Sequence, residues 1–118
     1  MIDGLIATTF AARNQANIEH WNTKSYAEHV ALGDFYEEVI DLVDEFVECY
    51  QGKFGLVGKV KLVPSTQSLC EMLKEDVDWM EDNREEITKG VNALGNLLDN
   101  IVDLYLRTLY KLENLNAW

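Results

Sequence analysis

Two histidines and a pair of carboxylates in the first half of the chain are the residues best suited to chemistry. His20 and His29 are the only histidines, and Asp44 and Glu48 stand four residues apart. In a helix, that spacing places the two carboxylates one turn apart on the same face. Imidazole nitrogens and carboxylate oxygens together suit iron, manganese or zinc. We therefore treat these four residues as candidate metal ligands.

Three of these residues lie in a segment with the periodicity of one long helix, predicted from about Tyr26 to Tyr50 and closed by Gly52. Its apolar residues recur at intervals of three and four: Leu32, Phe35, Val39, Leu42 and Phe46. His29 and Asp44 share a broad face of this helix but are separated by roughly 22 Å along its axis. No single ion can bind both residues of one chain. If both are ligands, they must come from two subunits related by a two-fold axis.

The same stretch resembles the mini-ferritins, the DNA-binding proteins from starved cells (Dps family). The resemblance rests on the His-Trp-Asn corner at residues 20–22, then His29, then Asp44 and Glu48 at the family's spacing from that second histidine. It implies a ferroxidase site between subunits, in which His20 and His29 of one chain face Asp44 and Glu48 of another. A further family carboxylate, one turn after the second histidine, would fall on Gly33 here.

The resemblance also implies a function and an assembly. The function is iron binding with ferroxidase activity and iron storage, with manganese or zinc as alternative metals. The assembly is a homo-oligomer, at least a dimer and, in the family's complete form, a hollow dodecameric shell. The implied fold is a ferritin-like four-helix bundle with a crossover between helices two and three.

The remainder of the chain predicts an all-α protein with a single domain over residues 1–118. The helices expected besides the one above are Ile2–Trp21 with Asp3 as N-cap, Ser65–Gly90 with Ser65 or Thr66 as N-cap, and Asn92–Asn114. Ser25 followed by Glu28 is a capping-box signature for the second helix. Residues 52–64 contain three glycines and Pro64, which indicates a non-helical crossover that lets helices two and three run parallel.

Charge and composition exclude several classes of function. Ten basic and 21 acidic residues give a net charge of −11, and no basic N-terminal arm is present, so we expect no nucleic-acid partner. No apolar run approaches the ~20 residues of a membrane span, so we expect no membrane contact. Two cysteines are too few for a disulfide framework. With no signal peptide visible, these features predict a cytoplasmic protein.

Each candidate residue also has a purely structural interpretation. His20 and Trp21 could be a helix C-terminal cap and a core plug, and Trp118 could pack on the bundle or form a subunit contact. The further carboxylates of the long helix are typical of a solvated face: Glu37, Glu38, Asp41 and Glu45. The alternative function is therefore a non-enzymatic helical structural or interaction protein with a degenerate metal site. An acidic DNA mimic is a third interpretation that rests on net charge alone.

Overall fold

The part of the chain that the computed structural model describes, residues 1–65 and 67–115, contains five helices and no strand. The helices are α1 (Ile2–Asn22), α2 (Tyr26–Phe54), α3 (Leu69–Asp82), α4 (Arg84–Thr88) and α5 (Asn92–Asn114). The predicted all-α class is therefore confirmed. Thr66 and Trp118, named above as a helix cap and a packing residue, lie outside the described residues.

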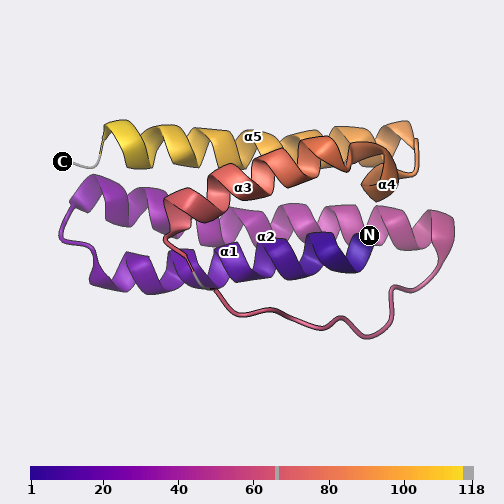
Figure 1. Ribbon diagram of the computed structural model, residues 1–118, viewed down its shortest axis with the longest axis horizontal. Coiled ribbons are helices and arrows are strands. Elements are labelled where there is room, and N and C mark those ends of the chain that lie inside the picture. Colours follow the sequence, from indigo (N-terminus) through magenta and orange to yellow (C-terminus); the bar gives the residue numbers. More distant parts are fainter. Residues whose placement is uncertain (66, 116–118) are drawn as a thin grey trace.

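The long helices lie side by side along the length of the molecule (Figure 1). A short turn makes α1 and α2 antiparallel, and the connection after α2 returns along the molecule, so that α3 runs in the same direction as α2. α5 then runs back. α1 packs on α2 and α3, and α5 packs on α2, α3 and α4. None of the described helices is long and apolar enough to cross a membrane.

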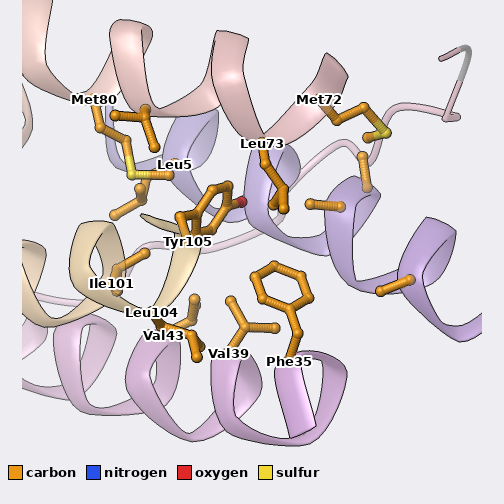
Figure 2. Packing of buried hydrophobic residues seen from close by; sticks show 14 of the residues in the cluster. Leu5, Phe35, Val39, Val43, Met72, Leu73, Met80, Ile101, Leu104 and Tyr105 are labelled. Atoms are coloured by element: carbon orange, nitrogen blue, oxygen red, sulfur yellow. The ribbon is translucent and has the colours of Figure 1, made fainter. Parts of the chain in front are cut away.

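The space between the helices is filled by apolar side chains from all the long ones (Figure 2). α2 buries Leu32, Phe35, Val39, Val43 and Phe46, and α3 buries Leu69, Met72, Leu73, Val77 and Met80. The predicted stripe of α2 is confirmed except that Leu42 is only partly buried. α1 contributes small side chains such as Ala12 and Ala16, which allow it to approach its neighbours closely. This core holds α1 and α2 together at the corner where the histidines lie.

The boundaries of α1 and α2 confirm one predicted cap and correct two details. Ser25 is the N-cap of α2, and its hydroxyl accepts a hydrogen bond from the Glu28 backbone N–H at 3.2 Å. α2 continues past Gly52 and ends at Phe54, since the first residue with a positive φ is Gly55, at 95°. Asp3 is not the N-cap of α1, because the helix begins at Ile2 with Met1 as N-cap; the Asp3 carboxylate, in the first turn, pairs with the N-terminal ammonium at 3.2 Å.

The predicted third helix is wrong at its start and in its continuity. α3 begins at Leu69, with Ser68 as N-cap. The Ser65 hydroxyl instead donates a hydrogen bond to the Ala11 carbonyl at 3.0 Å, which fastens the preceding segment to α1. At the other end, the Asn83 side chain donates to the Trp79 carbonyl at 2.8 Å, and the helix is interrupted there before α4. Asparagine side chains commonly compete with the helical backbone in this way.

Candidate metal site at the corner of α1 and α2

His20, in the last turn of α1, and His29, in the first turns of α2, meet across the corner between these helices. The Nδ1 atom of His20 lies 2.7 Å from the His29 carbonyl oxygen, and the Nδ1 atom of His29 lies 2.9 Å from the His20 carbonyl oxygen. The two imidazole rings are stacked, with 3.7 Å between centroids and 18° between planes. The short turn therefore brings the two predicted histidines together, each bonded to the backbone of the other.

These reciprocal hydrogen bonds determine which ring nitrogens are available. A carbonyl oxygen can only accept, so each Nδ1 must carry the hydrogen, and a neutral ring then has its free lone pair on Nε2. Neither Nε2 forms a hydrogen bond with any residue that the structure describes. Histidines that bind metals commonly donate their other ring N–H to a backbone carbonyl, which orients the ring. Both rings therefore have the tautomer and orientation of Nε2 metal ligands.

The histidine pair lies in a groove of about 350 Å³. The groove is lined by His20, Tyr26, His29, Val30, Gly33, Asp34, Tyr36 and Glu37. The edge of Tyr36 faces the His20 ring, with 5.3 Å between centroids. Asp34 and Glu37 are exposed at its margin. The groove is therefore open to an ion or to a second protein surface.

Gly33 has a specific part in this arrangement. A Cβ atom placed on it would lie 3.1 Å from Cε1 and 3.3 Å from Nδ1 of His20. The position at which the resemblance puts a further carboxylate ligand therefore gives room to the imidazole ring instead. The neighbouring Asp34 is exposed.

Asp44 and Glu48, the other predicted ligands, are exposed one turn apart on α2. Neither forms a hydrogen bond or ion pair within the described part of the chain. Because α2 is continuous, Asp44 remains roughly 22 Å along the axis from His29. Among the described residues, no three or more His, Cys, Asp or Glu side chains are close enough to hold a metal ion. One chain does not complete a site, and the site between two subunits remains a prediction.

Of the purely structural interpretations, the one for Trp21 is wrong and the one for the further carboxylates of α2 is confirmed. Trp21 is 71% exposed, so it is not a core plug. His20, half-buried in the last turn of α1, does lie where a helix favours a histidine. The four further carboxylates of α2 are all exposed, as expected of a solvated face: Glu37, Glu38, Asp41 and Glu45.

The sequence analysis missed a second polar pair, which joins half-buried Asp76 to buried Tyr105. The Tyr105 hydroxyl of α5 donates a hydrogen bond to Asp76 Oδ2 of α3 at 3.0 Å, and Tyr105 is completely buried. Burial raises the pKa of Asp76 from 3.8 to about 7; the Tyr105 hydrogen bond opposes this rise, and the nearby Glu75 carboxylate adds to it. Burial also raises the pKa of Tyr105. The only local signal is an acidic residue next to the apolar stripe of α3, which does not identify its partner on α5.

Comparisons with known proteins show a family but no activity. The model of a family described as "Family of unknown function (DUF5856)" matches residues 20–112, which include both histidines and both carboxylates. A protein of Enterobacteria phage T4, described as an uncharacterized 14.6 kDa protein in the mobD-ri intergenic region, is 27% identical over 115 residues. The alignment covers 94% of this chain and 87% of the phage protein. No solved structure matches the chain.

Proposed function

We propose that this chain, which belongs to the DUF5856 family, is a ferritin-like, iron-binding protein whose metal site is formed between two subunits. The observation that carries the proposal is the histidine pair. Both Nδ1 atoms are bonded to backbone carbonyls at 2.7 and 2.9 Å, which leaves the two Nε2 atoms as the ligands. Imidazole nitrogens bind iron and zinc well.

The second half of the site would come from a two-fold mate. Asp44 and Glu48 are exposed, one turn apart, and would supply oxygen ligands opposite His20 and His29 of the first chain. In a two-fold dimer the same surface of each subunit is used, so two equivalent sites form together. Iron, bound there as substrate, would supply the redox chemistry. The protein would supply the ligands and their arrangement. A twelve-subunit shell would combine six such dimers through further contacts.

The arrangement of the helices supports the ferritin-like part of the proposal. We infer a four-helix bundle in which α3 and α4 together act as one interrupted helix. The connection between α2 and α3 would then be the crossover of that fold, since it lets the two helices run parallel (Figure 1). The small, closely packed face of α1 is compatible with such a bundle.

We further place this protein in the cytoplasm and without a nucleic-acid partner. Cys49 and Cys70 are free thiols, which suits a reducing compartment. The net charge of −11 repels phosphate backbones. The DNA binding for which the mini-ferritins are named is therefore no part of the proposal.

The experiment is an anaerobic titration with Fe(II), read out as bound iron per chain, combined with the molecular mass from sedimentation. We expect a dimer or larger assembly that binds one ion per chain. The double substitution Asp44→Ala with Glu48→Ala should abolish this binding. The matched control is Asp41→Ala with Glu45→Ala, which removes two exposed carboxylates at the same spacing on the same helix. Undiminished binding by the first variant, or a monomer at every concentration, would contradict the proposal.

A second candidate, a helical interaction protein without metal chemistry, is favoured by one observation. Trp21 and Tyr26, beside the corner, are 71% and 75% exposed. Large exposed aromatic side chains are common at protein interfaces. The two candidates are separated by adding Fe(II) in air: a protein with the proposed ferroxidase site should make oxygen oxidise Fe(II) faster than it does in buffer, and an interaction protein should not.

A further inference from the structure

The His20 ring packs against α2 in a way that leaves it little freedom to move. One of its faces is stacked on His29 at 3.7 Å, and the Tyr36 ring contacts it edge-on. Its Nδ1 atom is bonded to the His29 carbonyl oxygen at 2.7 Å. A Cβ atom at position 33 would lie 3.3 Å from this Nδ1 atom and 3.1 Å from Cε1 of the same ring. Both distances are shorter than nine in ten real Cβ contacts. A Cβ atom at position 33 must therefore displace the ring by a few tenths of an ångström, and the displacement strains the hydrogen bond of Nδ1.

A second glycine of α2 shows that this crowding is specific. Gly52 also lies within the helix, but a Cβ atom there would meet nothing within 4 Å. Glycine inside a helix is less stable than alanine because it loses more backbone freedom on folding. Gly52→Ala should therefore stabilise the protein slightly. At Gly33 the same gain is opposed by the displacement of His20.

We infer that Gly33 is a positioning residue: its missing side chain lets the His20 imidazole pack against α2 with Nδ1 bonded to the His29 carbonyl oxygen and Nε2 free. The role of these Nε2 atoms as metal ligands rests on the proposed function, whereas the seating of the ring does not. Position 33 thus provides space for a nitrogen ligand where a carboxylate would provide an oxygen ligand. Position 33 therefore adds no oxygen ligand to the two imidazole nitrogens, which suit borderline ions such as Zn(II) or Fe(II).

The first test uses the metal-free protein labelled with ¹⁵N-histidine, at about pH 8, where an ordinary histidine is neutral. Ring ¹⁵N chemical shifts distinguish the two tautomers. Wild-type protein and Gly52→Ala should both show His20 and His29 with hydrogen on Nδ1. Gly33→Ala should show His20 as a mixture of tautomers, with a circular dichroism spectrum that remains helical. An unchanged His20 signal in Gly33→Ala would overturn the inference.

The second test is a thermodynamic cycle that needs no metal and tolerates a destabilised variant. Gly33→Ala should lower the melting temperature when His20 is present. In a His20→Ala background the crowding is gone, so the same substitution should raise the melting temperature, as alanine does elsewhere in a helix. An equal effect in both backgrounds would mean that Gly33 does not act through His20.

A Zn(II) titration connects this inference with the proposed function. We expect Gly33→Ala to weaken Zn(II) binding by about 10- to 100-fold, as is typical when a group that orients a ligand is lost, and Gly52→Ala to bind as wild type does. Unweakened binding by Gly33→Ala would overturn the positioning role. If wild type binds no metal while the tautomer shift and the thermodynamic cycle appear as expected, the proposed function fails and the role of Gly33 stands.

Discussion

The Asp76–Tyr105 pair between α3 and α5 and the His20–His29 pair between α1 and α2 both join helices through titratable side chains, but in opposite surroundings. The Tyr105 side chain is completely buried, and its hydroxyl is bonded to Asp76. The histidines are only half-buried or exposed, and they bond to backbone carbonyls instead of to each other's side chains. Tyr105 is therefore closed off from water, whereas the two histidines are not.

Because of this difference, the Asp76–Tyr105 pair bears on folding, whereas the His20–His29 pair is available for binding. In the core, removal from water favours the neutral form of Asp76 and raises its pKa to about 7. The hydrogen bond of that pair is made inside the protein. At the corner, each histidine uses one nitrogen for the fold and keeps the other free. Changes to the core pair should therefore alter stability, and changes to the histidine pair should alter binding.

The largest expected effect is the pH dependence that Asp76 gives to stability. Well below pH 3.8, Asp76 is protonated in both the folded and the unfolded protein. As the pH rises from about 4 to about 7, the unfolded chain releases the proton first, so the stability associated with the neutral carboxyl group is lost. A pKa raised from 3.8 to about 7 corresponds to at most about 4 kcal/mol. Asp76→Asn should remove this dependence.

The measurement is urea unfolding of wild type and Asp76→Asn at about pH 4.5 and pH 8. The asparagine carboxamide oxygen can still accept the Tyr105 hydrogen bond, so the variant should be relatively more stable at the higher pH. A difference between the two proteins that is the same at both pH values would show that Asp76 is not held neutral by burial.

Tyr105→Phe should have the next largest effect. It removes the only hydroxyl bonded to Asp76 within the described residues and leaves a half-buried carboxylate short of a donor, which costs about 1–3 kcal/mol at pH 8. Because the Tyr105 hydrogen bond lowers the pKa of Asp76, the loss should be smaller at pH 4.5, where the carboxyl group is neutral. Urea unfolding at both pH values checks this; an equal loss at each would contradict it.

His20→Ala combined with His29→Ala should change stability least, by about 1 kcal/mol, because water can replace the two imidazole donors at this exposed corner. Chemical denaturation at pH 8 measures this loss. If this loss equals the loss caused by Tyr105→Phe, the histidine pair contributes as much to stability as the Asp76–Tyr105 pair does. The contrast between the two pairs would then be wrong.

Much of the fold follows from periodicity in the sequence. The bounds of α5 agree with the prediction, and the buried stripes of α2 and α3 follow the spacing of their apolar residues. The start of α3 was harder, because Ser65 and Ser68 are equally good caps in isolation. The choice depends on contacts distant in sequence: the Glu19 carboxylate of α1 accepts a hydrogen bond from the Leu69 N–H at 2.8 Å. The break at Asn83 likewise depends on a side chain in competition with the backbone.

The candidate site was less accessible from sequence. Helix geometry predicts that His29 and Asp44 of one chain cannot bind the same ion, and the continuous α2 agrees with that prediction. The reciprocal bonding of His20 and His29 depends on how the turn between their helices closes, and the role of Gly33 depends on where the His20 ring comes to rest. Neither is encoded in residue spacing. The Asp76–Tyr105 pair joins two helices through residues that look ordinary on each helix alone.

The most direct test of a metal site between subunits is complementation between two inactive variants. One chain carries His20→Ala and His29→Ala, and the other carries Asp44→Ala and Glu48→Ala. In a two-fold dimer of the two, one site combines the intact histidines of one chain with the intact carboxylates of the other. Each variant alone should bind no Fe(II) under anaerobic conditions. Co-expressed chains that pair at random should bind about a quarter of the wild-type amount. A mixture that binds no more iron than the separate variants would contradict the site between subunits, as would either variant binding iron alone.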